Sequence, residues 1–304
     1  MGIHAMALRI APACRGFALV AVLWFVAALS VLVAGLLTVS RGEMLEAQLR
    51  LDSGRAAALG DAAIQIAVLD WASAKPPPDR LQRAHYTFDG VEIAVEIIPA
   101  SGYVNLNDAP EALLQALLLH GVGLPTDRAF QLAQRIVDWR DSDDAPLPHG
   151  AEADSYAAAG LGWRPRNGRF LVPEDLMQVL GVDFDLFARI QPFMTVWSSG
   201  GAGVNPMSAP VPVLTVLCQG GGEARRIAMA RDAGETGIDT SRLEQTFLRA
   251  GNVGNVLHVL ASVPAEGGRR AVRGRWVSLR PDPDGAPWQT IRAEPVRFAV
   301  EDEF

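Results

Sequence analysis

The sequence predicts an α+β protein, in which a long N-terminal helix packs on an antiparallel sheet and a large all-helical domain is inserted between the strands. Three features of the chain indicate this fold. The run Phe17–Ser40 carries no charge, helix-forming sequence continues to Ala74, and the short helices of residues 106–197 separate two groups of strand-like segments. A helix-plus-sheet domain with a helical insertion accounts for this order.

The uncharged run is long enough to cross a bilayer. It holds 24 residues, Phe17–Ser40, and at about 1.5 Å per residue it spans a hydrocarbon core of roughly 30 Å. Arg9 and Arg15 precede it and no acidic residue does, which favours a cytoplasmic N-terminus. The sequence therefore predicts a single-pass membrane protein whose C-terminal part lies outside the cytoplasm. In a two-membrane bacterium this means an inner-membrane protein with a periplasmic C-terminal part.

Helical sequence continues beyond this run. Residues 41–74 lack proline and are rich in Ala, Leu, Glu, Gln and Arg, which are good helix formers. Apolar residues recur there at close to helical spacing, so the inner half of this helix should pack on a sheet. The tract Lys75–Pro78 ends it, because proline lacks the amide donor and clashes with the preceding turn.

Strands are expected on both sides of the insertion. Val91–Ile97 alternates apolar and mostly polar residues, and Asp89-Gly90 marks a hairpin turn from Tyr86–Phe88. Later strand-like segments are Phe193–Trp197, Val211–Cys218, Val256–Pro264, Ala271–Arg280 and Ile291–Ala299. The short helices predicted within the insertion are Ala109–His120, Asp127–Trp139, Glu152–Ala159, Pro173–Val179 and Phe184–Ile190.

The domain organisation that follows has six parts. They are a leader at 1–16, a transmembrane helix at 17–40, its continuation at 41–74, the first part of the sheet at 75–105, the inserted helical domain at 106–197 and the second part of the sheet at 198–304. A weak internal repeat is also visible, because Val104–Pro110 returns as Val204–Pro210. A repeated capping turn explains it, with Asp108 as the cap of the first helix.

Residues 138–154 form the most distinctive local segment. They contain six carboxylates and one arginine, a local charge of −5. The carboxylates are Asp138, Asp141, Asp143, Asp144, Glu152 and Asp154. The first of them fall at the end of a predicted helix, where the macrodipole disfavours acids unless a cation is bound. Because Ca²⁺ takes several oxygen ligands, the segment predicts a structural calcium site; a solvated acidic loop is the alternative.

Within this segment we expect Asp141, Asp143, Asp144 and Glu152 to supply most of the calcium ligands. Asp138 is either a ligand or a group that orients one, and Asp154 is a weaker candidate. The histidines of the chain are scattered, and they form no Ser/His/Asp or metal motif. The sequence therefore predicts no catalytic residues and no enzymatic activity.

Composition weighs against a nucleic-acid partner. The net charge is −7 and the pI about 5.3, whereas nucleic-acid-binding domains are usually basic. Asn105–Pro110 and Gly121–Gly123 nevertheless resemble the helix-hairpin-helix module, whose Gly-x-Gly hairpin offers amides to a DNA phosphate. No lysine or arginine closely flanks these glycines, so a membrane-anchored DNA-uptake protein is kept only as the alternative hypothesis.

The start of the uncharged run resembles the class III leader of type IV pilins and type II secretion pseudopilins. Gly16 lies directly before the run, whereas a secretory signal peptide is cleaved after a shorter apolar core. In that family a prepilin peptidase cuts after the glycine and methylates the new N-terminal residue, here Phe17. Most members carry Glu at the fifth mature position, where this chain has Ala21, and its absence is typical of the K-type minor pseudopilin. A plain signal anchor is the alternative for this region.

The resemblance to the K-type minor pseudopilin (general secretion pathway protein K) extends over almost the whole chain. Its further matching segments are Gly102–Asn107, Ile136–Asp144, Gly150–Glu152, Pro173–Leu176 and Thr195–Val196. It implies a pilin-like fold, calcium in the inserted domain, and a tip complex with the I- and J-type minor pseudopilins on a pseudopilus of major pseudopilin. It also implies a function, the initiation and capping of a pseudopilus that exports folded proteins across the outer membrane. The size of the insertion favours the tip, since it would clash with a subunit stacked above it.

Overall fold

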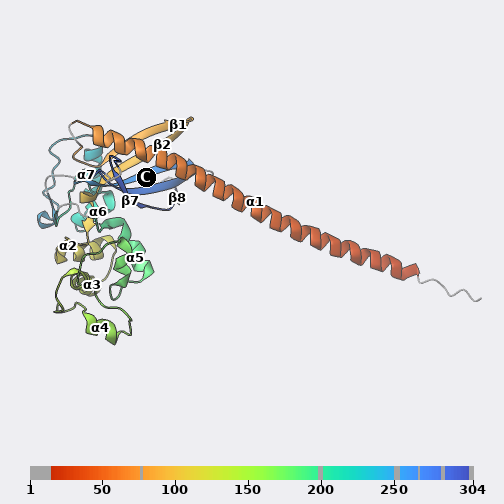
Figure 1. Ribbon diagram of the computed structural model, residues 1–304, viewed down its shortest axis with the longest axis horizontal. Helices are drawn as coiled ribbons and strands as arrows, with labels where there is room; N and C mark the ends of the chain where they lie inside the picture. The colour runs from red at the N-terminus through yellow and green to blue at the C-terminus, as the bar shows by residue number, and fades with distance from the viewer. Residues whose placement is uncertain are drawn as a thin grey trace, which may run out of the picture. The chain divides into compact units, whose positions relative to one another are not determined.

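The computed structural model of the chain describes residues 15–75, 78–197, 201–249, 254–265, 268–281 and 285–300, and within them it leaves the side chains of 15–18, 36–42, 45, 49 and 300 undescribed. The chain divides into two compact units, residues 1–55 and 56–304. Helix α1 (Arg15–Ser73) contributes residues to both units (Figure 1).

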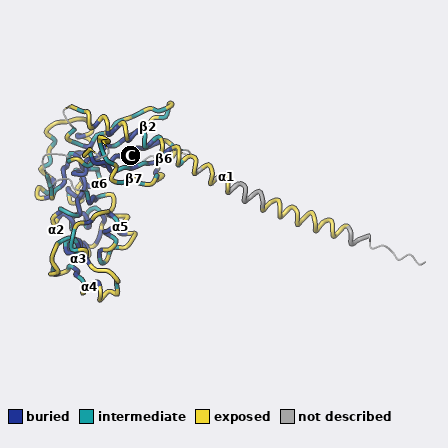
Figure 2. The backbone as a smooth tube through the Cα atoms, viewed as in Figure 1, coloured by how far each residue is buried: buried dark blue, intermediate teal, exposed yellow. Residues whose placement is uncertain are grey.

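In the first unit, α1 exposes its apolar side chains. Trp24 is 74% exposed and Phe25 75%, and Figure 2 shows this stretch in the exposed colour. Among the side chains that the structure describes, no helix is long and apolar enough to cross a membrane. The predicted processing residues Gly16 and Phe17, and both ends of the run 17–40, lie outside those side chains.

The second unit is built on a six-stranded antiparallel sheet. Its strands run in the order β1 (Gln82–Phe88), β2 (Val91–Pro99), β5 (Val256–Ala265), β6 (Arg269–Ser278) and β7 (Gln289–Ala293), and β8 (Arg297–Val300) also pairs with β6. The predicted hairpin turn between β1 and β2 is confirmed. Asp89 and Gly90 there have φ angles of 48° and 77°, as a two-residue turn with the twist of the strands requires.

The last turns of α1 cover one face of this sheet. Ala63, Ile64 and Ala67 are fully buried, and they share a core cluster with Ile93 of β2 and Val259 of β5. The prediction that the inner half of the long helix packs on a sheet is therefore confirmed. The apolar stripe predicted from helical spacing is the surface that removes this sheet face from water.

A charged cluster fastens the same contact between α1 and the sheet. A Cβ atom at Gly60 would lie only 2.7 Å from the Cβ of Arg273 on β6, so helix and strand approach closely there. Asp61 accepts hydrogen bonds from the Nε atoms of Arg273, at 2.7 Å, and of Arg275, at 2.8 Å. The acid and its two arginines join segments more than 200 residues apart in the chain.

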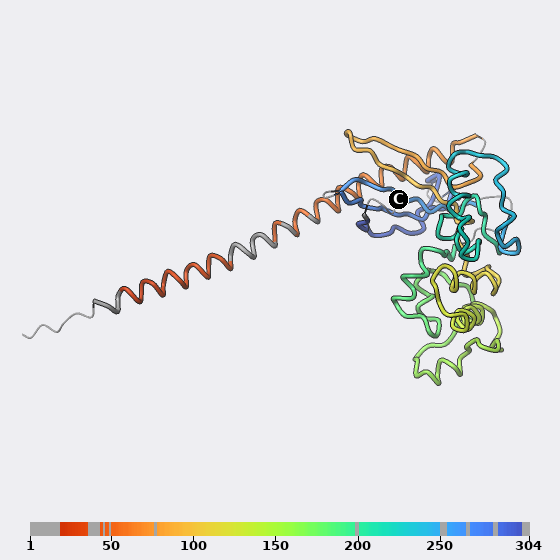
Figure 3. The backbone as a smooth tube through the Cα atoms, turned by 180° about the vertical axis from the view of Figure 1, so that it is seen from behind, coloured from red at the N-terminus to blue at the C-terminus, as the bar shows by residue number. Residues whose placement is uncertain are grey.

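Between β2 and β5 the chain is mostly helical. The elements are the 3₁₀-helix η1 (Ala100–Gly102), strand β3 (Val104–Asn105), α2 (Glu111–Ala116), the π-helix η2 (Leu117–Gly121), α3 (Thr126–Arg140), α4 (Ala153–Ala158), the 3₁₀-helix η3 (Pro173–Gln178), α5 (Phe184–Ile190), the 3₁₀-helix η4 (Gln191–Phe193), strand β4 (Met194–Thr195), α6 (Val211–Leu217), α7 (Glu223–Asp232) and the 3₁₀-helix η5 (Gln245–Phe247). Figure 3 shows the segments from α2 to α5, in yellow and green, as a group apart from the strands of the sheet. Strands β3 and β4 pair in parallel where this group begins and ends.

The predicted strand Val211–Cys218 is wrong, because these residues form helix α6. A short apolar run rich in valine is ambiguous between a buried strand and a buried helix. Tertiary packing decides the outcome. Val213, Leu214 and Leu217 are fully buried in the helical core, and Pro212 stands in the first turn of the helix, where a proline costs no hydrogen bond.

Two smaller predictions also need correction. The strand expected over Ile291–Ala299 is divided into β7 and β8 around Glu294–Val296, where Pro295 cannot donate to a ladder. Asp108 does not cap α2, whose N-cap is Pro110 without a side-chain hydrogen bond. Asp108 instead accepts hydrogen bonds from Asn105, at 2.9 Å, and from Arg169.

Candidate metal centre at the end of helix α3

Aromatic packing fixes the end of α3, from which the acidic segment leaves. Trp139 is buried and stacks on Phe170, with ring centroids 6.1 Å apart, and it also lies against Tyr156 of α4. Gln134, one turn earlier on α3, accepts a hydrogen bond from the His149 amide at 2.8 Å. The acidic segment is thus held at its start by α3 and at its end by α4.

Asp138 is the buried centre around which this segment folds. Its side chain has no exposed surface, and its Oδ2 atom accepts hydrogen bonds from the amides of Ala151, at 2.8 Å, and Leu147, at 3.2 Å. Burial, opposed by these amides, raises the pKa of Asp138. The carboxylate oxygens of Asp138 therefore accept hydrogen bonds that fix the loop backbone. While they do so, they are not free to coordinate a metal ion.

Asp141 and Glu152 have buried carboxylate oxygens without partners. Neither Oε atom of Glu152, nor the Oδ1 atom of Asp141, has a hydrogen-bond partner among the described residues. Burial, reinforced by Asp138, Asp141 and other nearby acids, raises the pKa of Glu152 to about 7. Burial, followed by the charges of Asp143 and Asp138, raises the pKa of Asp141 to about 6. Burying unpaired carboxylates is costly, and a bound cation would remove that cost.

Asp143 and Asp144 are exposed and already make hydrogen bonds. The Oδ1 atom of Asp143 accepts from the Ala145 amide at 2.9 Å. The Nδ2 atom of Asn167 donates to Asp144 Oδ1 at 2.7 Å and to the Asp143 carbonyl at 2.9 Å. Asn167, whose φ is 49°, was not among the predicted site residues. The Asn167-Gly168 pair is a turn signal in the sequence that could have drawn attention to it.

Five of the six predicted ligands lie near enough to one another for their charges to interact, and one does not. The charges acting on Glu152 are those of Asp138, Asp141, Asp144 and Asp143. Asp154 is exposed in the first turn of α4 and is absent from this set. Over the residues that the structure describes, no three Asp, Glu, His or Cys side chains are arranged to hold a metal ion jointly.

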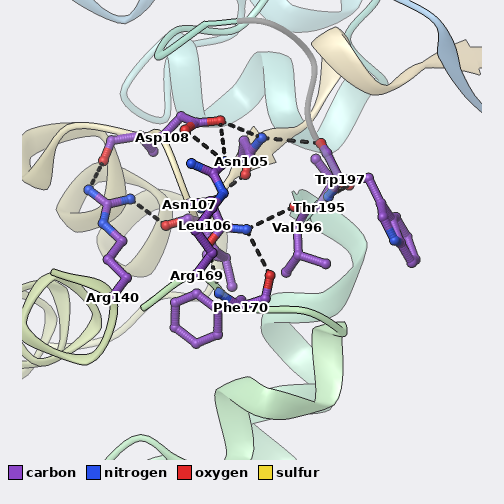
Figure 4. Close-up of polar contacts among 11 residues, drawn as sticks. Asn105, Leu106, Asn107, Asp108, Arg140, Arg169, Phe170, Thr195, Val196 and Trp197 are labelled. Atoms are coloured by element: carbon purple, nitrogen blue, oxygen red, sulfur yellow. Dashed lines mark hydrogen bonds and ion pairs between the residues drawn. The ribbon is translucent and has the colours of Figure 1, made fainter. Parts of the chain in front are cut away.

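Two asparagines tie the beginning of the helical group to its end. Asn105 donates to the Trp197 carbonyl at 3.1 Å, and Asn107 donates to the carbonyls of Val196, at 2.8 Å, and Phe170, at 2.9 Å. Figure 4 shows how the turn at Asn105–Asp108 is held: its two asparagine side chains bond to the segments at Phe170 and Val196–Trp197, and Arg140 of α3 bonds to its backbone from the other side. The asparagines of the motif Gly102–Asn107 therefore have a structural role, because their side-chain amides donate to backbone carbonyls of Val196 and Trp197, directly after β4.

The second copy of the repeated motif forms the same turn. The Asn205 side chain accepts from the Met207 amide at 3.0 Å, as the Asn105 side chain accepts from the Asn107 amide at 2.9 Å. The second copy contacts the residues just before the first, because a Cβ atom at Gly102 would lie 2.1 Å from the Ser208 carbonyl oxygen. Only glycine leaves room for this backbone contact.

Comparisons with known proteins agree on one family. Residues 100–199 match the family model described as type II secretion system (T2SS), protein K. The type II secretion system protein K of Pectobacterium carotovorum subsp. carotovorum is 31% identical over 134 residues, which are 40% of this chain and 41% of that protein. The protein of the same name from Pseudomonas aeruginosa is 30% identical over 54% of this chain and 53% of its own length. The protein of the same name from Klebsiella pneumoniae is 27% identical over 63% of this chain and 65% of its own length.

The chain thus spans less than two thirds of the length of each of these relatives. Among solved structures, a chain of the GspK-GspI-GspJ complex from the enterotoxigenic Escherichia coli Type 2 Secretion System is 16% identical, with a TM-score of 0.49, over 86% of this chain and 99% of that one. The family match covers residues 100–199, which include the helical group from α2 to α5 and the acidic segment at its centre. Residues 100–199 are thus similar to the type II secretion system protein K family, and these three relatives carry the same name.

Proposed function

We propose that this protein is the K-type minor pseudopilin at the tip of a type II secretion pseudopilus. There it initiates and caps the assembly that exports folded proteins across the outer membrane. The observation that carries the proposal is the family match over residues 100–199. The arrangement of α1 on an antiparallel sheet, with helices between β2 and β5, supports a pilin-like fold with an insertion. The role is structural, and no substrate is turned over.

The proposal includes an inner-membrane anchor with the N-terminus in the cytoplasm and the remaining chain in the periplasm. The uncharged sequence Phe17–Ser40 and the arginines before it support this orientation. The Gly16–Phe17 junction is the proposed site of cleavage and methylation by a prepilin peptidase. The DNA-uptake alternative has no support in the comparisons, which name type II secretion throughout.

The proposed partners are the I- and J-type minor pseudopilins and, below them, the major pseudopilin. The test is co-purification of the tagged full chain, in detergent, with the I- and J-type proteins expressed from the same cell. We expect a stoichiometric complex that survives size-exclusion chromatography. Elution of the chain without either protein, while the I and J proteins elute with each other, would contradict the proposal.

We also propose that the acidic segment binds one structural Ca²⁺. The oxygens of Glu152 and Asp141 that lack a hydrogen-bond partner among the described residues support this. These oxygens are buried, and burial together with neighbouring carboxylates raises the pKa of both groups, so a cation would offset both the cost of burial and the repulsion. Asp143 and Asp144 would complete the set after small rearrangements, and Asp138 would orient the loop. Bound calcium would reduce the negative charge of the segment and hold the inserted helices in shape for partner proteins.

Calcium dependence of unfolding tests this proposal directly. A ligand that binds only the native state adds about 2.7 kcal/mol at a hundredfold excess over its Kd, so the melting temperature of the full chain should rise with calcium and fall with chelator. Glu152→Gln and Asp141→Asn should remove the difference, whereas Asp154→Asn should retain it. Identical melting with calcium and with chelator, together with no metal in the purified protein, would leave a solvated acidic loop as the correct interpretation.

A further inference from the structure

A large open cavity lies between the sheet and the helices. Its volume is about 1380 Å³, and its walls come from β1, β2, β5 and β6 on one side and from α5, α6 and α7 on the other. Pockets for small ligands usually measure about 300–1,000 Å³. This cavity is larger than a metabolite needs and is open, as a groove for a segment of polypeptide would be.

The strand register puts Glu96, Leu260 and Ser262, which line the cavity, on the sheet face opposite α1. Glu96 pairs with Leu260, and Ser262 pairs with Val272. Leu260 and Val272 belong to the core cluster of the helical side, which is separate from the cluster under α1. The groove thus has apolar surface at its floor, and Met229 of α7, which is 72% exposed, adds apolar surface to the opposite wall.

Most of the acids that line the groove already have partners. Glu96 and Asp232 both pair with Arg83, and Glu174 pairs with Arg292 at 2.5 Å. Glu294 lies 3.2 Å from His258 Nε2 and accepts a hydrogen bond from Trp276 at 3.0 Å. Burial tends to raise the pKa of Glu294, but His258, Trp276 and Arg292 outweigh it and lower the pKa to about 2. Of the lining acids, only the exposed Glu92 has no ion pair with another described residue.

Three lining arginines, by contrast, have no carboxylate partner among the described residues. They are Arg225 on α7, Arg270 on β6 and Arg297 on β8. Arg225 and Arg297 are exposed. Arg270 is held in place by hydrogen bonds to the Oγ atom of Ser262, at 2.5 Å, and to its carbonyl, at 2.9 Å. Both walls of the groove therefore carry arginines that form no ion pair with another residue described by the structure.

We propose that this groove is a docking site for an extended acidic segment of a partner protein. In the sheet, Arg270 pairs with Ala299 and Val272 pairs with Arg297, so the two arginines are diagonal neighbours on one face. Such neighbours lie about 7–8 Å apart, close to the roughly 6.8 Å that separates alternate residues of an extended chain. Carboxylates at alternate positions reach both arginines, while the residues between them face the apolar parts of the walls.

Charge explains why a protein segment fits better than a nucleic acid. The groove is lined by five carboxylates and five arginines. A nucleic acid has a phosphate at every nucleotide, so some of its phosphates would lie beside these carboxylates and be repelled. A peptide can place its few carboxylates at the unpaired arginines and apolar side chains elsewhere. The groove is distinct from the acidic segment at 138–154, and the inference does not depend on calcium or on the proposed tip location.

Fluorescence anisotropy with defined peptides tests the inference on the full chain in detergent micelles. The probe is a fluorescein-labelled octapeptide of alternating Glu and Val, and its counterpart of alternating Lys and Val carries the same label. Empty micelles correct for partitioning. We expect the acidic peptide to bind at least tenfold more tightly than the basic one, with an affinity that falls as salt rises.

Charge reversal locates the binding site. Arg225→Glu and Arg297→Glu, both at exposed positions, should each weaken acidic-peptide binding at least fivefold and leave the melting temperature unchanged. The matched control is Arg280→Glu, which reverses an exposed arginine outside the groove and should bind as wild type does. Equal binding of the two peptides, no binding up to millimolar peptide, or an equal loss in the Arg280 variant would each overturn the inference.

Discussion

The carboxylate of Asp138 occupies the space where a side chain at position 150 would begin. A Cβ atom on Gly150 would lie 1.8 Å from Asp138 Oδ2, the oxygen that accepts the Ala151 amide. The glycine of the Gly150–Glu152 motif is therefore needed for close packing of loop against helix. Through this contact, the backbone that carries Glu152 is placed beside the end of α3.

Gly150→Ala should destabilise the protein, because the new methyl group displaces the Asp138 carboxylate from its amide donors. We expect a loss of about 1–3 kcal/mol, the usual cost of overpacking, measured by chemical denaturation of the full chain in detergent. Gly162→Ala is the control, since a Cβ there meets nothing within 4 Å. An equal effect of the two substitutions would contradict the role given to Asp138.

Without metal, stability should fall as the pH rises from about 5 to 8. Burial and neighbouring acids raise the pKa of Glu152 to about 7 and of Asp141 to about 6. The folded state then binds more protons than the unfolded state in this range, so its stability is greatest below the unfolded pKa values and is lost as pH passes through the folded ones. Thermal melting in chelator at pH 5.5 and 8 should show the higher midpoint at pH 5.5.

Glu152→Gln should flatten this pH dependence and raise the melting temperature at pH 8 in chelator. Asp154→Asn, at an exposed position, should leave both unchanged. Calcium should oppose the trend in the wild type, because it binds the deprotonated carboxylates and so stabilises most at high pH. A wild-type melting temperature in chelator that rises between pH 5.5 and 8 would show that these two carboxylates are not buried as described.

Asp61→Asn should loosen α1 from the sheet. Burial tends to raise the pKa of Asp61, but hydrogen bonds and charges from Arg273 and Arg275 outweigh it and hold the pKa below its usual value. Charged hydrogen bonds contribute about 1.5–3 kcal/mol each at most, so a loss of about 1–3 kcal/mol is expected on denaturation at pH 7. That contribution is present above the ordinary pKa of an unfolded Asp, about 4, and is lost as the pH falls through the lower pKa of folded Asp61. Asp52→Asn, on an exposed part of α1, should have no effect.

Processing is predicted between Gly16 and Phe17. Mass spectrometry of protein purified from a cell with a prepilin peptidase should find N-methyl-Phe17 as the first residue. Gly16→Leu should accumulate with its leader intact, because the peptidase needs a small residue there, whereas Gly2→Leu, distant from the junction, should be processed normally. An intact leader on the wild type, or cleavage after Ser40, would favour a plain signal anchor.

Much of the local structure followed from the sequence alone. Continuous helix formers ended by prolines predicted α1, the Asp89-Gly90 pair predicted the β1–β2 turn, and breaks at glycine and proline predicted the short helices of the insertion. These features depend on neighbours within a few residues, which the sequence displays directly. The acidic segment was visible for the same reason, since its carboxylates are close together in the chain.

Tertiary structure decided the features that depend on distant partners. Val211–Cys218 is apolar in either conformation, and the helical core into which Leu214 and Leu217 pack made it helix α6. Which carboxylates remain available to a cation was also decided there. Asp138 accepts hydrogen bonds from loop amides and Asp144 accepts one from Asn167. Glu152 is buried and has no hydrogen-bond donor among the residues that the structure describes. Hydrogen bonding and burial are set by groups that meet only after folding, so spacing in the sequence shows that acids gather but not which of them stay unpaired.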